Sequence, residues 1–185
     1  SIFKKFLVHT DKFWLKKKLN VDAKNLFLSS CNKFYKVKTD ERIKLFYKKF
    51  NKKDGNEHIN NIPMPYLNEI LKQINWDFIC AGSASRFHGD LHFENVIYNK
   101  KSKKTTFIDW RQDFGGNIEY GDIYYDLAKL LHGMLVNHSV ISKNRYSVSW
   151  SKKNIYYKIE RKKILISCEN YFYLWIKKNG FDVNK

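Results

Sequence analysis

The chain has 185 residues, of which 43% are hydrophobic and 17% aromatic, and it carries a formal net charge of +17. This length allows one domain with its own core, and this composition excludes a disordered or low-complexity protein. No long apolar run and no basic, apolar leader are present, so we expect neither a membrane span nor a secretory signal.

The positive charge does not by itself indicate a nucleic-acid-binding protein. Lysines are spread along the whole chain, whereas arginines, whose bidentate fork reads base edges, are few. We therefore do not expect nucleic acid as the primary partner, although the charge favours anionic ligands such as ATP. The three cysteines are far apart, which predicts reduced thiols in a cytoplasmic protein rather than disulfides or a zinc cluster: Cys31, Cys80 and Cys168.

The first third of the sequence predicts helices. Thr39 is placed to cap a helix whose apolar side chains recur at the spacing of one face: Ile43, Phe46, Tyr47 and Phe50. After a polar loop at residues 51–61, Pro63 and Pro65 open a second helix with its own apolar stripe: Leu67, Ile70, Leu71 and Ile74.

Two β-hairpins are predicted further along the chain. The runs 96–98 and 105–108 flank one polar turn, and the runs 148–150 and 155–159 flank another. A glycine-bearing loop at 114–121 leads into a strong helix with one apolar face, at 123–138. A last helix is expected over 160–179, with Gly180 where a C-cap belongs. The fold class is therefore α+β, mostly helical with one or two small hairpins.

The most informative segment is His-Gly-Asp-Leu-His-Phe-Glu-Asn at 88–95, followed by Ile-Asp-Trp at 108–110. Asp90 lies in a loop before the first strand of the hairpin, Asn95 begins that strand, and Asp109 ends its partner. A hairpin brings the start of one strand next to the end of the other, so these side chains should meet. They form a hard-oxygen set suited to Mg²⁺, and phosphoryl transfer uses such a set together with a carboxylate for the attacking hydroxyl.

The same residues resemble a known family. HGDLHFEN followed by IDW is similar to the HGDxxxxN and ID[WF] motifs of the aminoglycoside phosphotransferase and choline kinase group, which are relatives of protein kinases in fold. GDIYYDLA at 121–128 is similar to the GDxxxDLA stretch of that group. The three motifs occur in the family's order and cover residues 87–132 closely. The resemblance implies the large C-terminal lobe of a kinase-like fold.

Carried over by position, the resemblance implies a role for each motif residue. Asp90 would be the catalytic base or the carboxylate that orients the acceptor hydroxyl, and His88 would tie this catalytic loop to the core. Asn95 and Asp109 would be magnesium ligands, with Asp109 bridging to the ATP phosphates. Asp126 would brace the catalytic loop through hydrogen bonds.

Each assignment has a plainer alternative. Asn95 taken alone is a residue type that forms turns, and Asp126 near a helix start could simply favour the helix dipole. Arg111 and Asp113 could contact phosphate or acceptor, or could equally pair with each other on the surface. Structural roles are expected for three further polar residues of the motifs: His92, Glu94 and Asp122.

Kinases of this group hold ATP between two lobes, and the small lobe supplies a glycine-rich strand–loop–strand and a lysine. Neither is found here; the first residue is Ser1, not methionine, and the sequence stops soon after Gly180. We therefore expect a single domain over residues 1–185, equivalent to the large lobe. The small ATP-binding lobe would be absent from this chain, which alone would be weak or inactive.

The function implied is an ATP- and Mg²⁺-dependent phosphotransferase that moves the γ-phosphate to a hydroxyl of a small molecule. A sugar, an amino sugar or an amino alcohol such as choline are the acceptor classes of the group. Many aromatics and few acids follow residue 123, which favours a sugar or a quaternary amine over a cationic aminoglycoside. The alternative is a non-catalytic kinase-like binding or scaffolding module, and the oligomeric state stays open.

Overall fold

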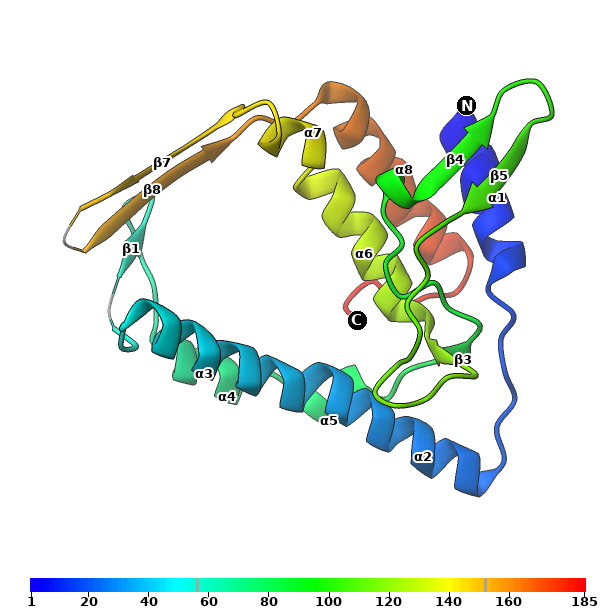
Figure 1. Ribbon diagram of the computed structural model, residues 1–185, viewed down its shortest axis with the longest axis horizontal. Helices are drawn as coiled ribbons and strands as arrows, with labels where there is room; N and C mark the ends of the chain where they lie inside the picture. Colours follow the sequence, from blue (N-terminus) through cyan, green and yellow to red (C-terminus); the bar gives the residue numbers. More distant parts are fainter. Residues whose placement is uncertain (56, 152) are drawn as a thin grey trace.

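The computed structural model describes residues 1–55, 57–151 and 153–185. It confirms a mixed α+β fold that is mostly helical (Figure 1). The helices are α1 Ile2–Phe13, α2 Val21–Asn32, the π-helical η1 Lys33–Val37, α3 Lys38–Phe50, α4 Leu67–Gln73, α5 Trp76–Cys80, the 3-10 turn η2 Phe93–Asn95, α6 Ile123–Leu135, α7 His138–Ile141 and α8 Lys163–Lys178. The strands are β1 His58–Ile59, β2 Ile62–Pro63, β3 Ala84–Ser85, β4 Val96–Asn99, β5 Lys104–Phe107, β6 Gly121–Asp122, β7 Tyr146–Trp150 and β8 Asn154–Ile159.

Both predicted hairpins are confirmed. In the first, β4 pairs antiparallel with β5, with Val96 opposite Phe107. In the second, β7 pairs antiparallel with β8, with Trp150 opposite Ile155. Residues alternate between the faces of a strand, so Val96 and Phe107 share one face of the first hairpin and pack against the core.

The prediction that Thr39 caps a helix is wrong. The helix begins much earlier, where the Asn20 side chain accepts a hydrogen bond from the Ala23 N–H at 2.9 Å. It then continues through α2, η1 and α3 without a break, and the Lys36–Asp40 pair at 3.3 Å spans the expected cap. The periodic apolar face is helical as predicted, but it is only the second half of one long helix.

The second predicted helix begins later than expected. Pro63 lies in strand β2, and α4 starts at Leu67, after Pro65. Its first N–H groups donate to the carboxylate of Asp54, from Leu67 at 2.8 Å and from Asn68 at 3.0 Å. The expected loop 51–61 therefore supplies a helix cap and strand β1, while residue 56 lies outside the described part.

Two helix boundaries near the C-terminal side also differ. Helix α6 ends at Leu135, and His138, predicted on its face, instead begins α7. Helix α8 starts at Lys163 rather than at 160, because Glu160 still donates its N–H to Arg145 O at 3.2 Å and so extends the β7–β8 ladder. Gly180 follows the last turn with φ of +75°, as its C-cap position predicts.

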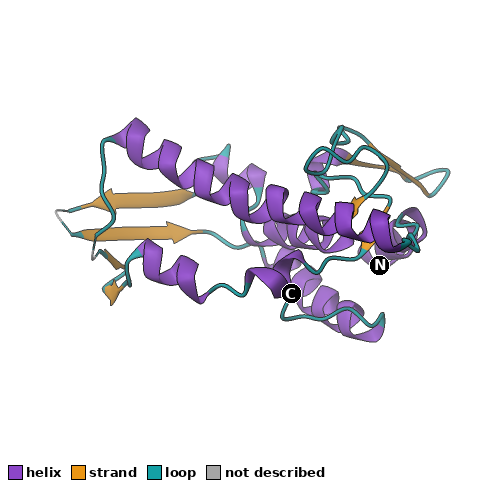
Figure 2. Cartoon of the chain, turned by 90° about the horizontal axis from the view of Figure 1, so that it is seen from below, coloured by secondary structure: helices purple, strands orange, loops and turns teal. Residues whose placement is uncertain are grey.

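The chain closes on itself through a mixed four-stranded sheet of order β2-β1-β8-β7. Strand β1, which follows the long helix, pairs parallel with β8, which precedes α8. In Figure 1 the long helix and this sheet follow the lower and left edges of the molecule, with α6 and α8 across from them. Figure 2 shows the long helix lying along the molecule, with the strands of this sheet at one end.

Two hydrophobic clusters form the core at the end of the molecule away from this sheet. The first lies among α1, α6 and α8 and contains Phe6, Leu7, Phe13, Trp14, Leu91, Ile123, Leu127, Leu130, Met134, Phe172, Trp175, Ile176 and Phe181. The second lies between the long helix and the glycine-bearing loop and contains Phe27, Cys31, Phe34, Cys80, Ala84, Phe87, Phe114 and Tyr120. Phe87 belongs to one cluster and Leu91 to the other, so the segment between them is anchored at both ends.

No helix in the described ranges is long and apolar enough to cross a membrane.

Candidate active site

The loop 88–90 is built around a glycine with left-handed backbone. Gly89 has φ of +80°, and a Cβ there would lie 2.4 Å from the Cβ of Arg111. A side chain at this position would therefore meet both a conformational penalty and a clash. The sharp turn aims the N–H groups of His88 and Gly89 at the same point of helix α6.

That point is the carboxylate of Asp126, which is fully buried. Its Oδ2 accepts hydrogen bonds from His88 N–H at 2.7 Å and from Trp14 Nε1–H at 2.9 Å, and its Oδ1 accepts from Gly89 N–H at 2.7 Å. Burial raises its pKa to about 6, while these hydrogen bonds act in the opposite direction. A buried carboxylate is costly unless it is fully hydrogen-bonded, and here it ties the loop to α6 and to α1.

His88 packs inside the loop. Its side chain is fully buried, and its ring lies 5.7 Å from the ring of Trp110, centroid to centroid, at 30°. Its Nδ1 accepts from Asp90 N–H at 3.3 Å, and its backbone carbonyl accepts from Arg111 N–H at 2.8 Å. Burial is the main cause that lowers the pKa of His88, so the imidazole is neutral at pH 7.

Asp90 is partly exposed and lies beside two basic side chains. Its Oδ1 lies 2.6 Å from Lys129 Nζ, and its Oδ2 lies 3.4 Å from His92 Nε2. Burial opposes ionisation of Asp90, but the hydrogen bond and charge of Lys129, followed by His92, outweigh it and hold the pKa of Asp90 below its usual range. At pH 7 the carboxylate is therefore ionised and able to accept a proton.

Asn95 lies directly beside Asp90. It is 6% exposed, and its Nδ2 donates to Asp90 O at 2.9 Å and to Asp90 Oδ2 at 3.4 Å. Its Oδ1 accepts no hydrogen bond from any described residue, so the amide oxygen is available as a ligand.

Asp109 follows the end of the partner strand. Ile108 N–H donates to Asn95 O at 3.0 Å, which extends the β4–β5 ladder and places the backbones of Asn95 and Asp109 at the same end of the hairpin. Asp109 has φ of +57°, a left-handed conformation that aspartate tolerates and that is common at functional sites. Its side chain is exposed and makes no hydrogen bond or ion pair within the described residues.

These donors fit a magnesium ion in its usual protein setting. Mg²⁺ is commonly held by one or two protein oxygens, with water and substrate phosphates completing the shell. Asn95 and Asp109 offer one amide oxygen and one carboxylate, neither of which has another partner among the described residues. No cluster of three His, Cys, Asp or Glu side chains in the described ranges forms a closed metal cage.

Arg111 and Asp113 do not pair with each other in the described part of the chain. Arg111 lies over the Phe34 ring, with its guanidinium carbon 5.3 Å from the centroid. Asp113 Oδ2 accepts from Gly116 N–H at 2.8 Å and so shapes the glycine-bearing loop. Asp122, predicted to be structural, caps α6 through Tyr124 N–H at 3.2 Å and accepts from Tyr35 O–H at 2.8 Å.

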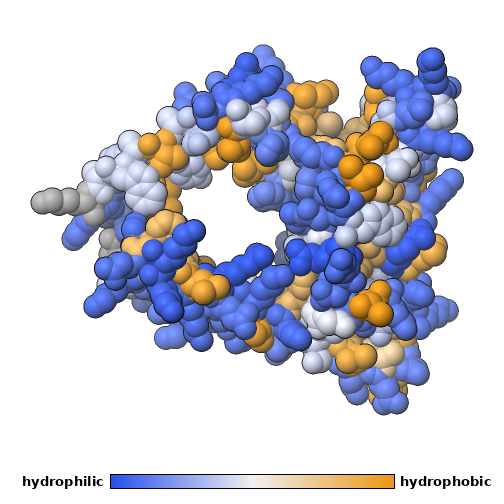
Figure 3. Space-filling model, in the orientation of Figure 1, coloured by the Kyte–Doolittle hydropathy of each residue, from blue (hydrophilic) through white to orange (hydrophobic). Residues whose placement is uncertain are grey.

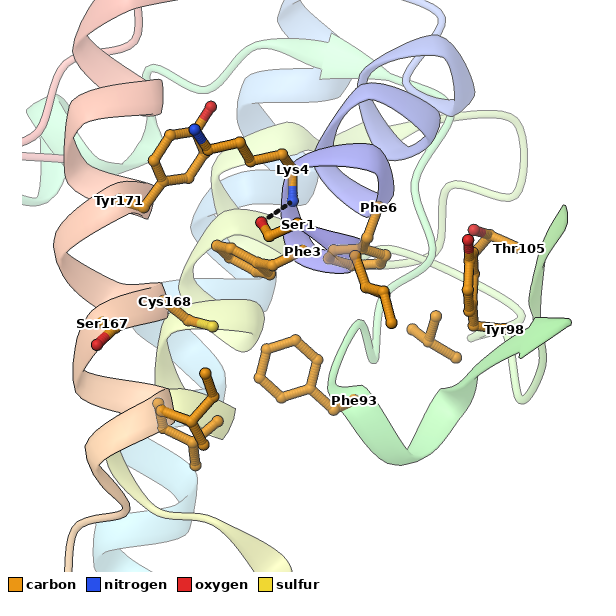
Figure 4. A pocket seen from close by; sticks show the side chains of 14 residues that line it. Ser1, Phe3, Lys4, Phe6, Phe93, Tyr98, Thr105, Ser167, Cys168 and Tyr171 are labelled. Atoms are coloured by element: carbon orange, nitrogen blue, oxygen red, sulfur yellow. Dashed lines mark hydrogen bonds between the residues drawn. The ribbon is translucent and has the colours of Figure 1, made fainter. Parts of the chain in front are cut away.

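An apolar cavity lies elsewhere. It has a volume of about 680 Å³ and opens among α1, the β4–β5 hairpin and α8. Its lining is mostly apolar, as the side chains of Phe3, Phe6 and Phe93 in Figure 4 show. Asp90, Asn95 and Asp109 do not line this cavity, so it is separate from the candidate active site.

Sequence reasoning missed two residues of this site. Lys129 lies three positions after Asp126 on α6, a spacing that places both on one face of the helix. This spacing could have drawn attention to Lys129. Trp14 directly follows α1, more than a hundred residues away from Asp126, and no local pattern links the two.

Comparison with known proteins gives one match. Residues 57–142 match the profile of the APH family, described as a phosphotransferase enzyme family. The searches of curated proteins and of solved structures gave no match. The matched segment contains the 88–95 loop, the β4–β5 hairpin and α6, while α1 to α3 and β7 to α8 lie outside it. The predicted resemblance is thereby confirmed at the level of the family model: residues 57–142 of this chain are similar to the phosphotransferase enzyme family.

Proposed function

We propose that this protein transfers the γ-phosphoryl group of ATP to a hydroxyl group of a small molecule. The observation that carries the proposal is the grouping of an ionised Asp90, a hydrogen-bonded Asn95 and an exposed Asp109 at one end of the hairpin. The family match supports phosphotransfer, and the grouping supports the hydroxyl acceptor and the metal.

In this proposal Asn95 and Asp109 hold Mg²⁺, which would neutralise the phosphate oxygens and orient them when bound. Asp90 orients the acceptor hydroxyl and takes its proton. The acceptor oxygen forms a bond to the γ-phosphorus while the bond from that phosphorus to the β–γ bridging oxygen breaks. ADP leaves with the bridging oxygen, and the proton stays on Asp90.

The outer face of the hairpin would hold part of the nucleotide. Ile97 lies opposite Thr106, and Ile108 is two residues further along, so alternation places all three on the same face. Ile97 is 54% exposed and Ile108 is 37% exposed. This apolar surface directly beside Asp109 suits a flat, uncharged base.

The direct test replaces the proposed base. Asp90→Asn keeps the size and the fold, and we expect it to lower phosphoryl transfer by roughly two to four orders of magnitude, the usual loss of a general base. Transfer is measured with radiolabelled ATP against sugars, amino sugars and amino alcohols, with Asp11→Asn on the exposed side of α1 as the matched control. Near-normal turnover in Asp90→Asn would remove Asp90 from the mechanism.

A further inference from the structure

Two adjoining pockets lie on the long helix, on the two sides of Phe34 and Lys38. The first, of about 280 Å³, is walled by aromatic side chains and also reaches Thr39, Arg42 and Ile79; the aromatic residues are Phe34, Tyr35, Trp76 and Tyr125. The second, of about 300 Å³, is bounded by η1, the start of α3 and the glycine-bearing loop, and Arg111 lines it. Phe34 and Lys38 line both, so the two pockets share a wall.

Three cations converge on this wall. Lys38 Nζ lies 4.5 Å from the centroid of the Phe34 ring, and Arg111 stacks on the same ring at 5.3 Å. Arg42 follows Lys38 by one helical turn and lines the first pocket. Burial lowers the pKa of Lys38, and the charges of Arg111 and Arg42 lower it further. Lys38 therefore lies close enough to both arginines to be repelled by them.

No ion pair in the described part of the chain neutralises these cations, although the charge of Asp113 partly offsets the effect of the two arginines on the pKa of Lys38. None of Lys38, Arg42 and Arg111 makes an ion pair with a described residue. The first pocket has no acidic residue in its lining. In the second, Glu41 and Asp113 contribute acids, but Lys33 adds a further positive charge. An anion placed here would relieve the repulsion and gain charge-assisted hydrogen bonds.

The pockets adjoin the candidate active site through two residues. Arg111 packs its Cβ against Gly89, which precedes Asp90, and its N–H donates to His88 O at 2.8 Å. Tyr125, which packs edge-on against Phe34 at 4.8 Å, precedes Asp126 on α6. Figure 3 shows the molecule hollowed at its centre, with hydrophilic residues along the rim that the long helix forms.

We propose that these paired pockets bind the acceptor, and that the acceptor carries an anionic group, a phosphate or a carboxylate, held by Lys38, Arg42 and Arg111. This inference rests on the proposed phosphotransferase function and narrows its substrate class. The aromatic walls suit the ring face of a sugar acid or sugar phosphate. A quaternary amine or a cationic aminoglycoside would meet three like charges, so the acceptor classes favoured by the sequence alone are narrowed to anionic sugars.

Binding without nucleotide tests this inference. Calorimetry on the full chain compares glucose, glucuronate and glucose 6-phosphate, with inorganic phosphate as the smallest probe. We expect the charged sugars to bind at least about tenfold more tightly than glucose, as charge-assisted hydrogen bonds would give. The double variant Lys38→Gln/Arg42→Gln should abolish this preference. Lys44→Gln/Lys48→Gln, on another face of the same helix, removes the same charge and should leave it intact.

Three results would overturn the inference. Charged and neutral probes that bind alike would show that no anion site exists. An equal loss in both double variants would show that only the diffuse positive charge of the chain is at work. In a separate titration with ATP, a loss of ATP binding in Lys38→Gln/Arg42→Gln, with sugar-phosphate binding retained, would assign the cations to the nucleotide. None of these binding measurements depends on turnover. A failure of the proposed transfer reaction, seen in the assay with Asp90→Asn, can therefore be told apart from a failure of this inference.

Discussion

At the scale of single residues, the contact between Asp90 and Lys129 shapes the expected chemistry most. A carboxylate that acts as a base must be ionised before the acceptor arrives. Lys129 at 2.6 Å keeps Asp90 ionised and occupies one of its oxygens, while His92 approaches the other at 3.4 Å. The acceptor hydroxyl would have to share or replace one of these partners, so we propose Lys129 as a positioning residue for Asp90.

Lys129→Met removes the charge and keeps most of the chain length. Because Lys129 lowers the pKa of Asp90, its loss should raise that pKa and move the acid limb of the kcat/KM profile to higher pH. The pH–rate profiles of the wild type and of the variant measure the shift. Lys143→Met, exposed in the turn after α7, is the control and should leave the profile unchanged. A Lys129→Met profile identical to that of the wild type would disconnect Lys129 from Asp90.

The motif residues could be predicted from the sequence, whereas their partners could not. Asp90, Asn95 and Asp109 are separated by short loops and one hairpin, so local patterns already bring them together. Lys129 and Trp14 meet these residues only through the packing of α6 and α1 against the loop. Such contacts depend on tertiary structure, for which a single sequence carries no periodic signal.

At the scale of elements, α6 organises the loop through one buried carboxylate. The folded chain holds the Asp126 proton up to about pH 6, whereas the ordinary pKa is 3.8. Between pH 3.8 and about pH 6, folding is therefore accompanied by uptake of a proton by Asp126. The contribution of Asp126 to the free energy of unfolding is largest below about pH 4. It falls as pH rises to about 6 and then stays level, with a steepest slope of roughly 1.4 kcal/mol per pH unit.

Asp126→Asn removes this titration. Its free energy of unfolding should be lower than that of the wild type at pH 4, by about 1–3 kcal/mol, since one of three buried donors loses its acceptor. The difference between the two proteins should shrink as pH rises to about 6. Urea unfolding at several pH values gives this difference, with Asp11→Asn as the exposed control. A difference that is constant with pH would contradict the raised pKa.

Most elements, but not all of their boundaries, could be predicted from the sequence. The two hairpins and helices α6 and α8 have strong periodic patterns within one short segment. The start of the long helix was missed because Thr39 resembles a cap, although α3 follows η1 directly and already begins at Lys38. Strand β1 has only two residues and is defined by its pairing with β2 and β8, so its own sequence could not reveal it.

At the scale of the whole molecule, the loop 88–90 connects two hydrophobic clusters. Phe87 anchors it to the cluster of the long helix, and Leu91 anchors it to the cluster of α1, α6 and α8. A shift of one cluster against the other would move Asp90 relative to the hairpin that carries Asp109. The geometry of the site therefore depends on segments on both sides of residues 57–142, which alone match the family.

We propose that these 185 residues supply only the large-lobe half of the phosphate-binding machinery. Phosphoryl transfer depends mostly on positioning and charge stabilisation, so the chain alone should transfer phosphate slowly or not at all. A form extended upstream through a glycine-rich hairpin and its lysine should gain both ATP affinity and turnover. A coupled ATP assay compares the two forms. Equal activity would show that another segment of these 185 residues binds the nucleotide.

The central claim is that Asn95 and Asp109 hold the metal that accompanies the nucleotide, and a titration of Mg²⁺–ATP by calorimetry tests it most directly. Asn95→Ala and Asp109→Ala should each weaken binding by at least about tenfold, since each removes one of two protein ligands. Asp11→Ala, which removes an exposed carboxylate from α1, should bind as the wild type does. Unchanged affinity in both site variants would contradict the account.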